Sequence, residues 1–265
     1  MTLPPDVWAV GAAYEPYIGR WSRLVARELV SWLAMPPGAR WLDVGCGTGA
    51  LAGAIVAGAD PAHVWAADAS AGFVAFARRD LSAARASFMV AVARALPCAA
   101  SVADAVVSGL VLNFVPEPER AAAEMARVAR SGAVVATYLW DYADGMQLLR
   151  AFWDAAVALD PEAAALDEGR RFPLCRPEAL TTLWQRAPLR DVECRPLDVA
   201  TRFASFEDLW TPFLGGQGPA PSYVASLDER RRARLRERLR ERLPAAPDGA
   251  IPLTARAWAV RGVRV

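Results

Sequence analysis

Hydrophobic and polar positions along the chain follow two patterns in turn. Short apolar runs predict strands, with their exits, at 40–44, 63–68, 88–91, 103–115 and 133–140. Helical spacing predicts helices at 14–33, at 50–57, from residue 71 and at 116–130. Strands that alternate with helices build a doubly wound parallel sheet, in which ligands bind beyond the carboxyl ends of the strands. We therefore expect an α/β fold with its site at those ends.

The second half of the chain is less regular. Apolar spacing predicts helices at 144–167 and 177–186 and strands at 191–199 and 253–263. We expect two helical insertions over the active site, at 142–175 and 201–245. The aromatic stripe at 203–214 suits either a hydrophobic core or a substrate pocket, and the glycine-rich break at 215–219 allows a lid to hinge.

The run at 228–242 is the most charged part of the sequence, with eight Arg and four acidic residues. Acids and arginines stand three or four positions apart, so they can pair along a helix. Leu235, Leu239 and Leu243 recur every four residues and form an apolar seam. We interpret the run as an amphipathic helix with a solvated face, and not as a nucleic-acid-binding element.

Composition narrows the range of functions. The formal net charge of +1 argues against a dominant electrostatic partner such as bulk nucleic acid. All 30 basic residues are Arg, which removes Lys as a catalytic base. The four cysteines lack C-x-x-C spacing, so we predict neither a metal site nor a disulfide framework. The single histidine, His63, starts a strand and should lie at the edge opposite the ligand crevice.

No signal-peptide pattern opens the sequence, and no apolar run reaches the roughly 18 to 20 residues of a membrane span. We therefore expect a cytoplasmic location and no membrane association. The sequence leaves the oligomeric state open.

The segment Leu42-Asp43-Val44-Gly45-Cys46-Gly47-Thr48-Gly49 carries the chemistry. It reads as a strand, a glycine turn and a helix start, which suits close approach of the backbone to a nucleotide-like ligand. Its spacing is G-x-G-x-G, whereas a dinucleotide-binding turn has G-x-G-x-x-G. This string resembles the first motif of the class I S-adenosylmethionine (SAM) dependent methyltransferases, of the type 11-like family.

The resemblance extends from about residue 14 to 140 and implies the fold and the cofactor. It implies a Rossmann-like sheet of seven strands, mostly parallel, with one antiparallel strand near the C-terminus. We expect one domain over 1–265, with a cap helix at 14–34 and a SAM-binding core at 40–140. The implied cofactor-binding residues are Tyr14, Arg20, Asp43, Gly45, Gly47, Asp68, Ala69, Val92, Ala93 and Ser108.

Two positions depart from the family pattern. The family often has Asp at the position of Val92, where it takes the adenine amino group, so one hydrogen bond is lost and adenine would rest on the backbone near Ala93 and on apolar contacts. It often has His at the position of Asn113, which keeps hydrogen bonding but cannot take up a proton at neutral pH. Asp141 is the remaining candidate for a catalytic base.

We predict methyl transfer from SAM to a small-molecule acceptor by direct displacement. The expected substrate-pocket residues are Tyr17, Asn113, Trp140, Tyr142, Trp210 and Phe213. Alternatives remain at this point: a SAM-binding protein without methyl transfer, a methyltransferase that acts on RNA or protein, and a nucleotide-dependent oxidoreductase. The glycine spacing speaks against the last of these.

Overall fold

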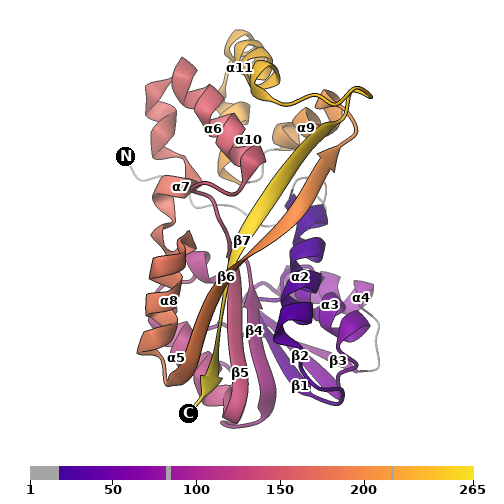
Figure 1. Ribbon diagram of the computed structural model, residues 1–265, viewed down its shortest axis with the longest axis vertical. Helices are drawn as coiled ribbons and strands as arrows, with labels where there is room; N and C mark the ends of the chain where they lie inside the picture. The colour runs from indigo at the N-terminus through magenta and orange to yellow at the C-terminus, as the bar shows by residue number, and fades with distance from the viewer. Residues whose placement is uncertain (1–17, 82–84, 216–217) are drawn as a thin grey trace. The chain divides into compact units, whose positions relative to one another are not determined.

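The chain groups into two compact units, seen in a computed structural model that describes residues 18–81, 85–215 and 218–265 (Figure 1). The sheet unit comprises 22–140, 174–197 and 257–265. The helical unit comprises the segment that ends at Trp21 together with 141–173 and 198–256. The predicted insertions at 142–175 and 201–245 fall almost wholly in the helical unit.

Seven strands form one sheet in the order β3-β2-β1-β4-β5-β7-β6. Strands β1 to β5 pair in parallel, and β7 runs antiparallel to β5. This confirms the predicted α/β fold with one antiparallel strand near the C-terminus. The strands are β1 (Arg40–Val44), β2 (His63–Asp68), β3 (Ala86–Val90), β4 (Ala103–Gly109), β5 (Ala129–Trp140), β6 (Leu189–Phe203) and β7 (Ile251–Arg264).

The bounds of β1 and β2 agree with the prediction, because both strands are continuous apolar runs that end where polar or glycine residues begin. Their register pairs Arg40 with His63 and Val44 with Ala67. The two strands therefore end side by side. β5 starts earlier than predicted, since Ala129 also pairs with Ala103 across a register shift.

Helices cover both faces of the sheet within the sheet unit. Figure 1 shows α2 (Arg20–Leu33), α3 (Ala50–Gly58) and α4 (Ala71–Asp80) on one side, with α5 (Pro118–Val128) and α8 (Pro177–Arg186) on the other. Ser70 caps α4, as predicted, since its hydroxyl accepts the Phe73 N–H at 3.3 Å. The Trp184 indole N–H donates to the Val135 carbonyl at 3.1 Å and fixes α8 to β5. Short 3-10 turns, η2 (Leu112–Phe114) and η4 (Pro173–Cys175), complete the connections.

The helical unit has its own aromatic core. Phe152 stacks on Phe213 with ring centroids 4.6 Å apart, and Trp153 and Tyr223 pack at its edges. The predicted amphipathic helix is present as α11 (Glu229–Arg242), where Leu235 and Leu239 are buried. The elements are α6 (Gln147–Leu159), η3 (Pro161–Ala165), α7 (Glu168–Arg171), α9 (Phe206–Trp210), η5 (Thr211–Gly215), α10 (Pro219–Ser226) and α11 (Glu229–Arg242). Among the described residues, every helix is too short or too polar to cross a bilayer.

Glu168 is a buried carboxyl in the core of the helical unit. It is only 4% exposed, and it accepts a hydrogen bond from the Trp153 indole N–H. Burial raises the pKa of Glu168 to about 7, and backbone and indole hydrogen bonds offset only part of the effect. The carboxyl therefore holds its proton far above the pH at which a solvated glutamate loses it.

This pKa predicts a pH-dependent gain in stability for Glu168→Gln. The folded-state pKa exceeds the ordinary value of 4.5, so wild-type stability falls as pH rises from there to about 7. Glutamine keeps an acceptor for Trp153 and never ionises. We expect the variant to unfold with a free energy about 1 to 3 kcal/mol higher than wild type at pH 8, and nearly equal at pH 5. Urea unfolding at both pH values measures this.

Glu162→Gln is the matched control, because Glu162 is an exposed glutamate in the neighbouring η3. It should change the stability equally little at both pH values. An identical effect of Glu168→Gln at pH 5 and pH 8 would contradict the assignment.

Candidate functional site

The glycine turn after β1 requires glycine for its backbone. Gly45, Gly47 and Gly49 have φ values of +77°, +52° and +91°, the left-handed region that L side chains rarely adopt. The Gly45 and Cys46 N–H groups both donate to the Ala67 carbonyl, at 2.7 and 2.9 Å. The turn is therefore tied to the end of β2.

The surroundings of the three glycines differ. A Cβ on Gly45 would lie 2.6 Å from the Val111 side chain, and one on Gly49 would lie 2.7 Å from Leu81. A Cβ on Gly47 would meet no atom within 4 Å. Gly45 and Gly49 thus allow the turn to pack, whereas Gly47 borders open space that a ligand could approach.

Asp68, at the carboxyl end of β2, connects this turn to the next helix. One carboxylate oxygen accepts the Gly47 N–H at 2.9 Å, and the other accepts the Ser70 N–H at 2.8 Å. A carboxylate has about four lone-pair sites, so two stay available for other donors. The half-buried position suits paired hydroxyl groups of a ribose.

Asp43 lies beneath the turn and is fully buried. Neither carboxylate oxygen has a hydrogen-bond partner of good geometry among the described residues. Burial raises the pKa of Asp43 to about 7; the Ala52 N–H lowers it, and the nearby Asp68 charge raises it further. The ionised form of such a buried carboxyl would be stabilised by a cationic ligand, because the described part of the chain places no positive side chain beside it.

Three further buried polar groups near the ends of strands lack hydrogen-bond partners within the described residues. They are the Ser108 hydroxyl near the end of β4, the Asn113 amide nitrogen in η2 and the Trp140 indole N–H that ends β5. Buried polar groups are normally satisfied, so such exceptions require an explanation. Their position at the carboxyl ends of β4 and β5 favours a bound molecule that completes them.

The end of β3 presents the remaining cofactor candidates of the sheet unit. The Ala91 N–H donates to the Asp68 carbonyl at 2.9 Å, which keeps this loop beside the end of β2. Val92 and Ala69 are exposed, and Ala93 is half-buried. The predicted cofactor-binding residues of the sheet unit thus all lie near the carboxyl ends of β1 to β4. They are Asp43, Gly45, Gly47, Asp68, Ala69, Val92, Ala93 and Ser108.

Cys46 fills the centre of the glycine turn. Its thiol is buried, and burial, together with the Asp43 and Asp68 charges, raises its pKa well above the usual range. The thiol therefore stays protonated, and a small buried side chain that fills the turn accounts for this residue.

Arg20 belongs to the helical unit and is engaged there. Its guanidinium donates to Asp208 at 3.1 Å and lies over the Trp21 and Phe203 rings, at 4.5 and 4.6 Å. Its Nε and one terminal nitrogen have no hydrogen-bond partner in the described chain. Sequence reasoning missed Asp208 as the partner, since it lies 188 positions away.

Asp141 and Tyr142 follow β5 and also belong to the helical unit. The Asp141 carboxylate is buried and accepts the Asp144 N–H at 3.1 Å, while its carbonyl accepts the Gly145 and Met146 N–H groups. These bonds give Asp141 a structural part in a tight turn. Tyr142 is buried with its ring 5.8 Å from that of Phe172.

The other substrate-pocket candidates meet different surroundings. Trp210 and Phe213 are buried and pack on each other with centroids 5.9 Å apart, as members of the aromatic core. Of the two interpretations of the aromatic stripe, this packing favours the core. Tyr14 and Tyr17 lie outside the described residues.

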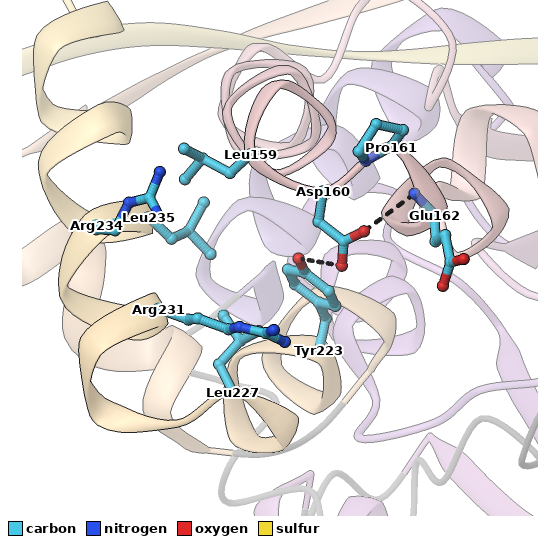
Figure 2. A pocket seen from close by; sticks show the side chains of 9 residues that line it. All are labelled: Leu159, Asp160, Pro161, Glu162, Tyr223, Leu227, Arg231, Arg234 and Leu235. Carbon is cyan, nitrogen blue, oxygen red and sulfur yellow. Dashed lines mark hydrogen bonds between the residues drawn. The ribbon is translucent and has the colours of Figure 1, made fainter.

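The helical unit contains a cavity of about 380 Å³ between α6, η3, α10 and α11 (Figure 2). The Tyr223 hydroxyl donates to Asp160 at 3.3 Å, and the second oxygen of Asp160 accepts the Glu162 N–H. Burial and the Asp160 charge raise the pKa of Tyr223 to about 12. Asp160 and Tyr223 thus bind each other, and the cavity offers no unsatisfied buried group.

The described geometry suits a nucleotide-like ligand at the carboxyl ends of a doubly wound sheet, and comparisons with known proteins show which proteins the chain resembles. Residues 42–137 match the family model of the methyltransferase domain. An uncharacterized protein of Mycobacterium tuberculosis is 37% identical over 141 residues, which are 52% of this chain and 50% of that protein. The chain thus spans about half the length of the curated relatives it matches first.

Two further similar proteins have names that state an activity. A malonyl-[acyl-carrier protein] O-methyltransferase of Methylococcus capsulatus is 35% identical over 102 residues, 38% of this chain and 37% of that protein. The solved structure of a Haemonchus contortus phosphoethanolamine N-methyltransferase with SAM is 15% identical, with a TM-score of 0.57, and covers 96% of this chain and 56% of that one. Residues 42–137 therefore match a methyltransferase domain, which supports the predicted class I, SAM-dependent type.

The glycine turn generates a stability prediction. Alanine at Gly47 has to adopt a positive φ but meets no neighbour, so we expect a loss of about 1 to 2 kcal/mol in the free energy of unfolding. Alanine at Gly45 also collides with Val111 and should lose about 1 to 3 kcal/mol more. Urea unfolding of both variants measures the difference. Equal losses would show that the contact with Val111 has no energetic importance.

Proposed function

We propose that the protein transfers a methyl group from SAM to a small-molecule acceptor by direct displacement. The observation that carries the proposal is the buried Asp43 carboxyl beneath an open glycine turn, next to Asp68 at the end of β2. SAM is a cation at its sulfonium and amino groups and carries two ribose hydroxyls, so it complements both carboxylates. The matched family and the SAM-bound structural neighbour support the same cofactor.

The residues of the sheet unit divide the binding among them. Asp68 accepts the ribose hydroxyls with the lone pairs that Gly47 and Ser70 leave available. The glycine turn at Gly45 and Gly47 lets the ligand approach the backbone closely. Asp43 provides a negative charge opposite the cationic groups of SAM. Ser108 and Trp140 contribute unsatisfied donors at the ends of β4 and β5.

The predicted residues of the helical unit are proposed for the site by their chemistry alone. Arg20 keeps two guanidinium nitrogens without partners, which suit the carboxylate of SAM. Tyr142, and Tyr14 and Tyr17 outside the described residues, are aromatic groups that would attract the sulfonium cation. Asn113, Trp210 and Phe213 stay predictions as substrate-pocket residues.

Catalysis by this chain consists mainly of alignment. SAM supplies an activated methyl group, so the protein positions the acceptor in line with it and excludes water. Asp141 is held by the Asp144 N–H, and no lysine exists to serve as a base. We therefore propose an acceptor that needs no deprotonation by the enzyme, such as a carboxylate or another acidic oxygen, or a nucleophilic carbon.

The two named relatives bear on the acceptor. One acts, by its name, on a malonyl group carried by a protein, and the other on phosphoethanolamine. Both names describe small acceptor groups, one of them carried by a protein, so they support a small acceptor group without choosing between a free and a carrier-bound one. The cytoplasmic location and the absence of a nucleic-acid partner stay predictions.

Calorimetry with SAM and S-adenosylhomocysteine tests the cofactor, and transfer of tritiated methyl groups to a panel of acids tests the activity. We expect both ligands to bind and at least one acid to be labelled. Failure of both ligands to bind would reject the proposal. Tight binding without labelling of any acceptor would favour a SAM-binding protein without transfer, and a salt-sensitive RNA shift or labelling of protein would favour those substrates.

The Asp68 assignment has its own prediction. Asp68→Ala removes an ionised acceptor for two hydroxyls, so S-adenosylhomocysteine should bind about 10- to 100-fold more weakly. Asp80→Ala is the matched control, because Asp80 is exposed at the end of α4, and its affinity should equal that of wild type. Calorimetry measures both constants, and undiminished binding by Asp68→Ala would remove Asp68 from the site.

A further inference from the structure

The cavity of the helical unit is lined by side chains of opposite charge. Its positive side chains are Arg231 and Arg234 of α11 (Figure 2). Its negative side chains are Asp160 and Glu162, at the start of η3. All four belong to the same compact unit. Among the ion pairs of the described residues, none joins either of these arginines to either acid, so the cavity keeps the opposite charges apart.

The two arginines form a cationic pair on one face of α11. Residues three positions apart on a helix are neighbours, so both guanidinium groups can reach the same anion. The Arg231 side chain lies 3.6 Å from Asp228, in a contact between two largely exposed groups that holds it weakly. The Arg234 side chain has no ion pair or hydrogen bond to any residue that the structure describes. The pair is therefore available to an anionic group of a ligand.

The two acids are available to a cationic group. Asp160 accepts the Tyr223 O–H at 3.3 Å and the Glu162 N–H at 3.1 Å, which hold its carboxylate in place and leave further lone pairs. The Glu162 carboxylate is exposed and makes no ion pair within the described chain. The Tyr223 hydroxyl is influenced from both sides, because burial and the Asp160 charge raise its pKa while the Arg231 charge partly offsets them.

Apolar side chains complete the lining of the cavity. Leu159, Leu227 and Leu235 contribute to it, and Leu159 is a large apolar residue that remains 36% exposed (Figure 2). The volume of about 380 Å³ lies within the range of roughly 300 to 1,000 Å³ that small-molecule sites have. A ligand that fits this lining therefore has an apolar body as well as charged groups.

The balance of charges selects the class of ligand. A simple anion would be attracted by the arginines and repelled by the acids, and a simple cation would meet the reverse. We propose that this cavity binds a zwitterionic small molecule with an apolar body, such as a free apolar amino acid. Its carboxylate lies at Arg231 and Arg234, and its ammonium group lies at Asp160 and Glu162. The site shares no residue with the proposed cofactor site and does not rest on methyl transfer.

Calorimetry on the full chain tests the class of ligand with probes that share one apolar body. L-Phenylalanine is compared with 3-phenylpropionate, which lacks the ammonium group, and with 2-phenylethylamine, which lacks the carboxylate. The same comparison of 6-aminohexanoate with hexanoate and hexylamine covers a longer separation of the charges. We expect at least one of the two zwitterions to bind about 10-fold or more tightly than both of its singly charged analogues.

Two exposed positions test the two ends of the cavity separately. Arg234→Gln removes a partner of the carboxylate, so the zwitterion should lose most of its preference over the amine. Glu162→Gln removes a partner of the ammonium group, so the preference over the carboxylate analogue should fall. Arg230→Gln is the matched control, because Arg230 is an exposed arginine of α11 outside the cavity lining, and it should bind like wild type.

The outcomes distinguish this cavity from the cofactor site. Binding of neither zwitterion, or equal binding of a zwitterion and its matched anion, would overturn the inference, as would unchanged preferences in both cavity variants. Loss of probe binding in Asp68→Ala would also overturn it, since the probe would then occupy the proposed cofactor site. Failure of S-adenosylhomocysteine to bind, with the zwitterion still bound, would reject the proposed cofactor and support the separate cavity site.

Discussion

The hydrogen bonds of Asp68 are the constraint on which the site depends. One side chain at the end of β2 holds the glycine turn through the Gly47 N–H and the start of α4 through the Ser70 N–H. The Ala67 carbonyl, one residue earlier, holds the same turn through two more N–H groups. Because β1 and β2 end in register, these few bonds fix three backbone segments around one open space. These segments are therefore already in place before a ligand binds.

Organisation of this kind has an energetic cost within the free protein. A fully buried carboxyl at Asp43 and unsatisfied polar groups at Ser108 and Trp140 each lower the stability of the fold. Proteins retain such groups where a ligand repays the cost, since binding then supplies the missing partners. In the sheet unit, the apolar core between the sheet and its helices provides the stability, and the polar groups at the strand ends reduce it.

The sequence predicted the sheet unit far better than the helical unit. β1, β2 and α8 have the predicted bounds, because local apolar runs and glycine or proline breaks define them. α10 was missed, because two prolines, Pro219 and Pro221, and a weak apolar pattern conceal a short helix. The buried Glu168 and the Arg20–Asp208 pair also escaped prediction. Both depend on packing between distant segments, which leaves no local periodic signal.

The buried Cys46 thiol offers a measure of how often the glycine turn opens. Reagents that attack thiolates need an accessible, deprotonated sulfur, and this thiol is neither while the turn is closed. Its modification rate therefore counts the openings of the turn, in the manner of hydrogen exchange at a single site. A ligand that bridges Asp43 and Asp68 would slow that rate without touching the sulfur. The reactivity of Cys46 thus reports how often the glycine turn opens.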